Sequence, residues 1–375
     1  MNEHNNPQYL VYVECFTYNH AKYIENTLNG FCIQQTNFPF VCIIVDDAST
    51  DGEQNVIKAY LEDNFDIQDQ SVARNEENDD YFLIFARHKK NKNCYFATLF
   101  LKYNHYSIGK LKYPYIEEWT NSKYVALCEG DDYWIDSQKL QKQVAFLEKN
   151  QDYVLCYSDA YRYDIDKKRN RGRVGLFSRR HNVRESASKQ ELFYKVLDGY
   201  YYIQTLTVLY RRDAVIDRPV EKKKFMMGDT NLWLYLSQKG KFHYFDECFG
   251  VYNIHIGSAT HSKDSKARFS LSMFEMRCYY CEESDYIIPE RLKRQYNRAL
   301  FNIILSQGEI IPPPIYPPFR MNSFQWFVIQ QIIKKGTFYR FYRYIIHPIE
   351  KNLFSLASRL EITIRVLSNL SLVAR

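Results

Sequence analysis

The sequence lacks long apolar segments, including the apolar stretch that a signal peptide needs. The region from Met1 to Gln8 is polar, which argues against a secretory signal. The most apolar segment, Tyr200 to Tyr210, is interrupted by Gln204 and two threonines, and it is shorter than the roughly 18 residues of a membrane-spanning helix. We therefore expect a cytoplasmic protein without a spanning helix.

The nine cysteines show no pairing pattern. Cys42, Cys128 and Cys156 lie inside apolar runs, where a thiol acts as a small hydrophobic side chain. We expect no disulfide framework, which fits a reducing compartment. Cys278 and Cys281 form one CxxC pair without a second pair of ligands, so packing is the stronger interpretation and metal or redox use the weaker one.

The net positive charge of the chain comes from its last residues. The formal net charge is +6, and residues 320–375 alone contribute +7, so residues 1–319 are close to neutral. This distribution argues against a general nucleic-acid-binding protein and indicates one basic appendage.

Aromatic residues are abundant, with 33 Tyr and 25 Phe. Tyrosine-rich surfaces stack on sugar rings, but the same side chains also fill core and half-buried positions. Composition alone leaves both interpretations open.

The first 160 residues alternate between patterns typical of strands and of helices. This order predicts a parallel sheet with right-handed crossovers. Residues 64–120 give no clear pattern, whereas a further helix is expected between Asp229 and Gly240, followed by a strand at 242–245. In the first 160 residues we expect strands at 9–16, 40–45, 124–128 and 154–157 and helices at about 21–35, after Gly52 and from the capping residue Asp136 to about Asn150.

Polar clusters follow three of these strands, where ligands of open parallel sheets bind. They are Thr17-Tyr18-Asn19, Asp46-Asp47 and Asp131-Asp132. Adjacent carboxylates are costly unless a cation joins them, and Mg²⁺ or Mn²⁺ is commonly shared between carboxylates and substrate phosphates. The alternative is that the aspartates only form turns or cap the helices that follow.

Three motifs in order then resemble family 2 glycosyltransferases with the GT-A fold. They are Phe16 to His20, Val45 to Gly52 and Glu129 to Trp134. The resemblance extends from residue 9 to about 260. It implies an α/β fold with a Rossmann-like, mostly parallel central sheet flanked by helices. It also implies inverting transfer of a sugar from a UDP-, GDP- or dTDP-sugar to an acceptor hydroxyl, in surface polysaccharide synthesis.

The resemblance, together with the composition of the residues after it, predicts a domain organisation. Residues 1–260 would form the catalytic domain, with a nucleotide-sugar half at about 1–160 and an acceptor half at about 161–260. A helical extension with a proline-rich linker would follow at 261–319, and then a basic, aromatic helical tail at 320–375.

Roles for the motif residues follow from the resemblance. Residues 17–19 would flank the nucleotide base and diphosphate. One of Asp46 and Asp47, preferably Asp47, would hydrogen-bond the base. Asp131 would face the ribose and donor sugar, and Asp132 would bind the Mg²⁺ or Mn²⁺ ion.

Later residues complete the expected site. Asp229, at the start of a helix, would take the proton of the acceptor hydroxyl; the competing interpretation, which can coexist, is a helix N-cap. His255 would complete the metal shell or contact the diphosphate, or else be structural. Gln204, Thr205 and Trp134 are positional candidates for the acceptor pocket, whose ligand would be a saccharide or a lipid-linked saccharide.

The tail and the function class each allow more than one interpretation. The tail mixes Phe338, Tyr342 and other aromatics with Arg340 and Arg343, a pattern that suits a peripheral position on the inner face of an anionic membrane and also a helix packed on the catalytic domain. Other functions are a degenerate sugar-binding or scaffold module, or a sugar-phosphate nucleotidyltransferase, which normally needs a glycine-rich loop after the first strand.

Overall fold

The computed structural model describes residues 9–174, 188–198, 203–218, 225–226, 228–255, 263–307, 316 and 319. The chain divides into two compact units. The larger contains Met1–Lys224 and Gly228–Ser258, and the smaller contains Phe225–Met227 and Ala259–Arg375. The predicted tail at 320–375 and most of the proline-rich linker lie outside the described residues.

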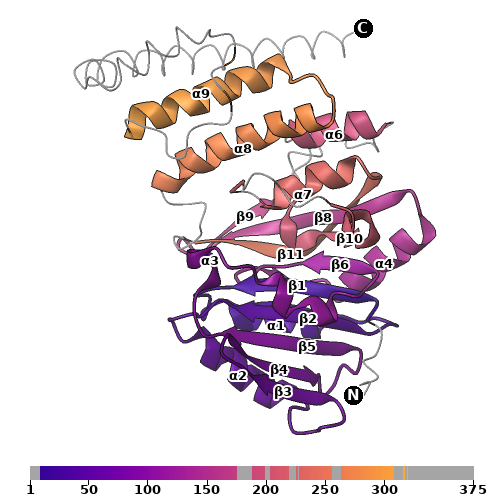
Figure 1. The fold of residues 1–375 in the computed structure, drawn as a ribbon. Helices are drawn as coiled ribbons and strands as arrows, with labels where there is room; N and C mark the ends of the chain where they lie inside the picture. The colour runs from indigo at the N-terminus through magenta and orange to yellow at the C-terminus, as the bar shows by residue number, and fades with distance from the viewer. Residues whose placement is uncertain are drawn as a thin grey trace. The chain divides into compact units, whose positions relative to one another are not determined.

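One eleven-stranded sheet forms the centre of the described larger unit (Figure 1). Its spatial order is β3-β4-β5-β2-β1-β6-β10-β8-β11-β7, and β9 pairs with β8. The strands are β1 (Val11–Thr17), β2 (Phe40–Asp46), β3 (Ala73–Glu77), β4 (Tyr81–Arg87), β5 (Cys94–Leu101), β6 (Tyr124–Leu127), β7 (Tyr133–Trp134), β8 (Tyr153–Asp164), β9 (Arg169–Arg173), β10 (Leu209–Arg211) and β11 (Lys241–Ile254).

The sheet is parallel at its centre and mixed at its sides. Strands β5, β2, β1 and β6 run parallel, as do β8 and β11. Strands β3, β4 and β5 are successive antiparallel neighbours, because the short connections between them cannot hold the crossover that parallel strands need. The predicted α/β class with a central sheet flanked by helices is confirmed. Fewer of the strand pairs are parallel than the prediction of a mostly parallel sheet implied.

Helices and short 3₁₀ turns connect the strands. No described helix is both long enough and apolar enough to cross a bilayer. The helical segments of the larger unit are α1 (Ile24–Cys32), α2 (Glu53–Asn64), α3 (His105–Ile108), η1 (Tyr113–Tyr115), η2 (Glu117–Trp119), α4 (Lys139–Lys149), α6 (Lys189–Leu197), η3 (Thr205–Thr207), η4 (Asp213–Val215) and α7 (Gly228–Ser237).

Strand β1 separates two environments, because successive side chains of a strand point to opposite faces. Val11, Val13 and Cys15 are fully buried in the main core, to which α1, α2 and α4 contribute their apolar faces. Tyr12 and Glu14 point to the other face, where they line a cavity. The core packing therefore fixes which side chains of β1 face the cavity.

Residues 64–120, for which the sequence pattern was unclear, contain β3 to β5. Strands β4 and β5 are largely buried, whereas β3 is polar and half exposed. The alternation of apolar and polar residues that identifies a strand is therefore weak in β3. Asp136, the predicted cap, accepts a hydrogen bond from the backbone N of Gln138 at 2.7 Å. It therefore stabilises the turn immediately before α4 rather than the first helical residue.

The smaller unit contains a helical hairpin of α8 (Lys263–Glu283) and α9 (Glu290–Gln307). Cys278 and Cys281 are both fully buried in it, together with Tyr296 and Leu300. Neither of the two forms a disulfide. Their spacing therefore places them in the packing between the two helices, which gives the CxxC pair a structural explanation.

Candidate active site

The loops that follow β1 and β2 are joined into one unit. The backbone N of Asn19 donates to Ser49 Oγ at 2.8 Å, and the backbone N of Thr50 donates to Asn19 Oδ1 at 2.8 Å. The backbone N of Ala21 donates to Asp51 Oδ2 at 2.9 Å. Asn19 has a φ of 58°, a left-handed conformation that Asn tolerates better than most residues. Asn19 thus joins two of the predicted motifs.

A buried carboxylate orients a histidine within this unit. Glu53 is fully buried; it accepts hydrogen bonds from the Thr17 hydroxyl and from the backbone N of His20 at 2.8 Å. Thr17 Oγ1 lies 3.1 Å from His20 Nδ1. Because the hydroxyl proton is directed to Glu53, Thr17 accepts from Nδ1–H. Neutral His20 then carries its lone pair on Nε2.

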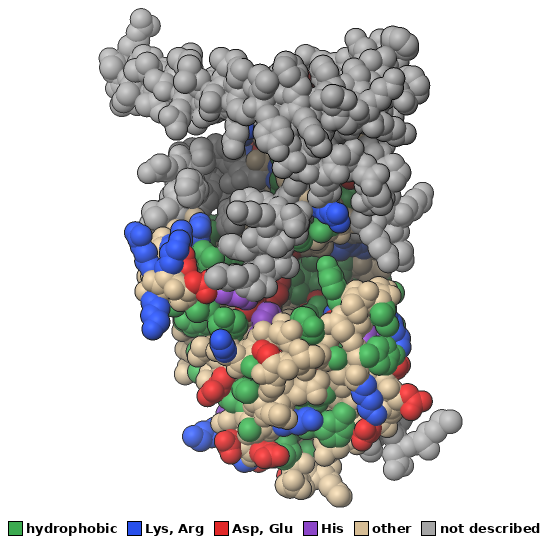
Figure 2. All heavy atoms as spheres, turned by 90° about the vertical axis from the view of Figure 1, so that its left-hand side faces the viewer, with side chains coloured by type: hydrophobic (Ala, Val, Ile, Leu, Met, Phe, Trp, Pro, Cys, Tyr) green, Lys and Arg blue, Asp and Glu red, His purple; other side chains and the backbone are tan. Residues whose placement is uncertain are grey.

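His20, Asp131 and His255 meet at the end of the central strands. One ligand atom from each lies within 4.8 Å of the others. Asp131 Oδ2 is 3.0 Å from His255 Nε2 and 3.9 Å from His20 Nε2. Histidine side chains also adjoin acidic ones on the face drawn in Figure 2. Two imidazoles and one carboxylate converging on one point form a candidate metal centre.

The local charges support an ionised Asp131. Burial disfavours its charge, but the hydrogen bond with His255 and the nearby His20 outweigh this effect and lower its pKa. Burial also lowers the pKa of His20, although Asp131 opposes this. At neutral pH a carboxylate and a neutral imidazole therefore face each other, as metal ligands must.

Asp132 occupies a different place from the one predicted for it. Its side chain is only 3% exposed, and Oδ1 accepts a hydrogen bond from the backbone N of Asn253 at 2.8 Å. Burial and the neighbouring acidic groups raise its pKa well above the usual range. The geometry thus favours Asp131 over Asp132 as a metal ligand, because Asp132 is directed toward β11.

Gly130 allows the acidic loop to approach the first motif. A Cβ atom at this position would overlap Thr17 Oγ1 and lie 2.5 Å from the Cβ atom of Thr17 and 3.1 Å from His20 Nδ1. Only glycine permits this contact without displacement. The Thr27 hydroxyl lies 2.6 Å from the carbonyl oxygen of Asp132 and 3.0 Å from that of Gly130, and its hydrogen bond holds the loop from the other side.

The second motif is more structural than predicted. Asp47 is 2% exposed and pairs with Lys112 Nζ at 2.8 Å. It also accepts from the backbone N atoms of His105 and Tyr106 at 2.7 and 3.1 Å. Both oxygens are therefore engaged, which leaves Asp47 poorly suited to the predicted contact with a base. Asp46 Oδ2 has no hydrogen-bond partner among the described residues.

A cavity of about 650 Å³ adjoins the acidic loop within the larger unit. Asp229 and Glu129 both line it, and the Thr205 hydroxyl lies 3.3 Å from Asp229 Oδ2. Asp229 is the second residue of α7, where a carboxylate is favoured by the helix dipole. Asp229 is partly exposed to this cavity and free of any ion pair among the described residues.

The other acceptor candidates differ from Thr205. Trp134 is 2% exposed, its Nε1 donates to the carbonyl of Leu206 at 2.7 Å, and its ring packs against Phe31. It is a core residue. Gln204 is 7% exposed and is not among the residues that line the cavity. Positional reasoning placed them near the site, but it could not predict their burial.

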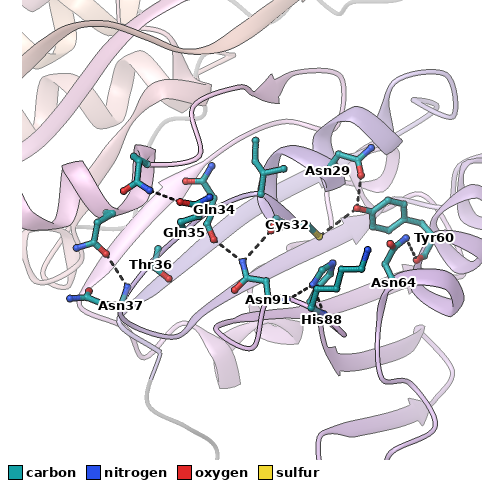
Figure 3. Close-up of a pocket in the computed structure, with 14 residues that line it drawn as sticks. Asn29, Cys32, Gln34, Gln35, Thr36, Asn37, Tyr60, Asn64, His88 and Asn91 are labelled. Atoms are coloured by element: carbon teal, nitrogen blue, oxygen red, sulfur yellow. Dashed lines mark hydrogen bonds between the residues drawn. The ribbon is translucent and has the colours of Figure 1, made fainter.

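A larger cavity, of about 740 Å³, lies at the opposite ends of the strands (Figure 3). Its rim is rich in amides, yet they are used internally. Asn91 Nδ2 donates to the carbonyls of Cys32 and Gln34 at 3.1 and 2.7 Å, and Tyr60 donates to Asn29 at 2.8 Å. The amides fasten the connections that precede β2 and β5, which explains their number.

Sequence reasoning missed His20, Glu53 and Glu14. His20 ends the first motif and was visible there as a metal-ligand type next to polar residues. Glu53 follows the second motif directly, but its hydrogen-bond partner Thr17 lies 36 residues earlier in the sequence. Glu14 stood inside an apolar strand as its one charged residue, a signal of a special environment.

Comparison with known proteins gives matches of three kinds. Residues 15–82 match the model of the family described as Glycosyl transferase family 2. Uncharacterised proteins of Mycobacterium bovis and Mycobacterium tuberculosis are each 32% identical to this chain over 142 residues, which are 38% of this chain. The chain spans about a third of the length of these relatives, 32% being aligned.

Two solved structures are also similar. S. aureus TarS 1–349 is 14% identical and covers 80% of this chain and 75% of its own, with a TM-score of 0.47. A mannosyltransferase from Pyrobaculum calidifontis, solved in complex with GDP-Man and Mn²⁺, is 13% identical and covers 93% of this chain and 90% of its own, also with a TM-score of 0.47.

Proposed function

We propose, from the confirmed resemblance of residues 15–82 to glycosyl transferase family 2, that this chain transfers a sugar to an acceptor hydroxyl. The donor is a nucleoside-diphosphate sugar, and the transfer inverts the anomeric centre. The observation that carries the proposal is the convergence of His20, Asp131 and His255 at the carboxyl ends of parallel strands, next to a cavity containing Asp229.

The donor is assigned to the joined loops after β1 and β2 and to the acidic loop. Tyr18 is 43% exposed there and available to stack on a base. His20, Asp131 and His255 fit a divalent ion, and imidazole ligands favour Mn²⁺ over Mg²⁺. When bound, the ion neutralises charge on the departing diphosphate. Thr17 and Glu53 fix the ring of His20 so that Nε2 faces Asp131.

Asp229 is assigned as the base. It lines the cavity and is not part of the cluster that would hold the diphosphate, which fits a displacement from the opposite side of the sugar. Its carboxylate would accept the proton of the acceptor hydroxyl as that oxygen attacks the anomeric carbon. Glu129 belongs to the acidic loop with Asp131 and lines the same cavity as Asp229, which supports a donor region next to the acceptor region.

The proposal extends to the product, the acceptor and contact with a membrane. We infer that the product belongs to a surface polysaccharide and that the acceptor is a saccharide or a lipid-linked saccharide. Contact with a membrane surface through residues 320–375 would fit the second kind of acceptor. Deleting 320–375 and measuring liposome flotation tests this part, and unchanged flotation would disprove it.

The main test measures nucleoside diphosphate release from UDP-, GDP- and dTDP-sugars, with and without EDTA. We expect release that depends on a divalent ion and is lost in Asp131→Asn. Asp229→Asn should lower transfer by about 10²- to 10⁴-fold, the usual contribution of a general base. Asp63→Asn, an exposed substitution on α2, is the matched control. Turnover that survives both EDTA and Asp131→Asn would refute the metal assignment, and full transfer by Asp229→Asn would remove that residue as base.

A further inference from the structure

We propose that the cavity beside Asp229 binds a neutral sugar ring of the acceptor and that Glu14 selects it by accepting hydrogen bonds from two neighbouring ring hydroxyls. This inference rests on the proposed glycosyl transfer and adds the chemistry of the acceptor. It makes Glu14 a specificity-determining residue, separate from the base and from the candidate metal ligands.

Glu14 has a rigid position close to the reacting groups. It pairs in register with Ile43 of β2 and Leu127 of β6, so the strand is held on both sides. Its carbonyl accepts a hydrogen bond from the backbone N of Cys128 at 3.1 Å. Glu129 of the acidic loop comes next in sequence, and both glutamates line the same cavity as Asp229. A ligand that contacts Glu14 is therefore next to the base.

The carboxylate of Glu14 lacks a partner of its own. No hydrogen bond or ion pair within the described part of the chain reaches it, and the half-buried side chain lines the cavity. Loss of water raises the pKa of Glu14 to about 7. A half-buried carboxylate that has lost part of its water without gaining a donor costs stability, and such costs are typical of positions kept for binding. The missing donors are supplied by hydroxyl groups of a ligand.

The remaining wall suits a sugar ring. A cavity of about 650 Å³ falls within the usual size range of ligand sites. Three tyrosines and one phenylalanine supply flat apolar faces, and carboxylates are the strong acceptors for hydroxyl groups. The aromatic residues of the wall are Tyr12, Phe16, Tyr113 and Tyr210.

The need of Glu14 for hydrogen-bond donors determines which acceptors are rejected. Glu14, Glu129 and Asp229 are three acidic groups, whereas Arg212 and Arg218 are the two basic ones among the described lining residues. The guanidinium of Arg218 lies over the ring of Tyr235, 5.8 Å from its centre. Burial raises the pKa of Glu14 to about 7 and that of Glu129 to about 8, so the wall has no acidic excess at neutral pH. A phosphate or carboxylate is disfavoured beside Glu14 for another reason: unlike a hydroxyl group, the ionised anion offers no hydrogen-bond donor to the Glu14 oxygens. A neutral ring is favoured over a sugar phosphate or a uronate.

The binding test uses saturation-transfer NMR on the full chain with methyl glycosides of common hexoses and N-acetylhexosamines. Matched methyl uronosides, hexose 6-phosphates and glucosamine form the charged arms. We expect at least one neutral glycoside to bind more tightly than its charged relatives, with affinity reduced roughly 10- to 100-fold in Glu14→Ala, the loss of hydrogen bonds to a charged group. Strongest binding of an anionic or cationic relative, or no neutral binder at all, would overturn the proposal.

Kinetics with the best glycoside separates selection from folding. Glu14→Gln should raise the acceptor KM about tenfold with a much smaller change in kcat, because an amide oxygen accepts more weakly than a carboxylate. Glu62→Gln, an exposed substitution on α2, is the control and should change neither constant. An unchanged acceptor KM in both Glu14 variants, with the wild-type circular dichroism spectrum retained, would show that Glu14 does not contact the acceptor.

The two proposals fail in different ways. Binding of methyl glycosides needs no donor and no turnover. If no nucleotide sugar is consumed but neutral glycosides bind and lose affinity in the Glu14 variants, the proposed glycosyl transfer is wrong and the proposed sugar site is supported. If nucleotide sugars are consumed but the affinity for glycosides is unchanged in the Glu14 variants, glycosyl transfer is supported and the acceptor proposal is wrong.

Discussion

Replacing Glu14 by Gln should stabilise the protein at alkaline pH and leave it nearly unchanged at acidic pH. Burial raises the pKa of Glu14 from its ordinary value of 4.5 to about 7. Between these two values the folded protein binds a proton that the unfolded chain has released. Stability therefore falls as pH rises through this window. A neutral Gln removes the effect and keeps nearly the same shape.

The magnitude follows from the size of the shift. One pKa unit corresponds to about 1.4 kcal/mol, so the charged carboxylate costs the wild type at most about 3 kcal/mol at pH 8 and less than about 1 kcal/mol at pH 5. Partial exposure of the side chain makes the actual gain smaller. We expect Glu14→Gln to be more stable than the wild type by about 1 to 3 kcal/mol at pH 8.

Several other titratable groups share the cavity with Glu14, so the comparison must be made between variants at each pH. They are Tyr12, Tyr113, Glu129, Tyr210, Arg212, Arg218 and Asp229. Their contributions cancel to first order when the wild type and Glu14→Gln are measured side by side. Glu62→Gln, at an exposed position of α2, reports the effect of removing one surface charge.

Urea unfolding followed by tryptophan fluorescence is the assay, because Trp119, Trp134 and Trp233 lie in the larger unit. The gain should appear at pH 8, disappear at pH 5 and be absent in Glu62→Gln. An equal gain at both pH values would mean that shape and not charge is responsible. A loss at pH 8 would refute the prediction, because it would show that the carboxylate of Glu14 is stabilised in the folded protein.

Three further substitutions test the site. Gly130→Ala should destabilise the larger unit by about 2 kcal/mol or more and lower activity, because the new Cβ overlaps Thr17 Oγ1; a thermal melt measures this. Thr17→Val should weaken Mn²⁺ affinity about 10- to 100-fold by releasing the ring of His20, measured by electron paramagnetic resonance of free Mn²⁺. Lys112→Met should cost roughly 3 kcal/mol in urea unfolding, because Asp47 remains buried without its cation.

Each of these expectations has a clear contrary result. Wild-type stability in Gly130→Ala would mean that the acidic loop is not held against the first motif. Unchanged Mn²⁺ affinity in Thr17→Val would show that the hydroxyl does not orient the histidine. A Lys112→Met protein as stable as the wild type would make the ion pair with Asp47 unimportant.

Part of this protein was determined by local sequence alone. The run from Tyr9 to Phe16 and the run from Phe40 to Val45 are apolar enough to be buried strands wherever they occur, and β1 and β2 lie close to those bounds. The polar residues that end them were recognised for the same reason. Periodicity and turn chemistry act over a few residues, so a single sequence contains the information.

Other features were decided by contacts between distant residues. Asp131 and Asp132 are adjacent and chemically identical, and only packing of the acidic loop against β11 directs Asp132 to Asn253 and leaves Asp131 to His20 and His255. In the sequence, Glu14 is only one acidic residue in an apolar strand. In the folded protein, residues of β6 and α7 form a cavity beside it. Such partners are selected by long-range packing, which no local pattern of residues specifies.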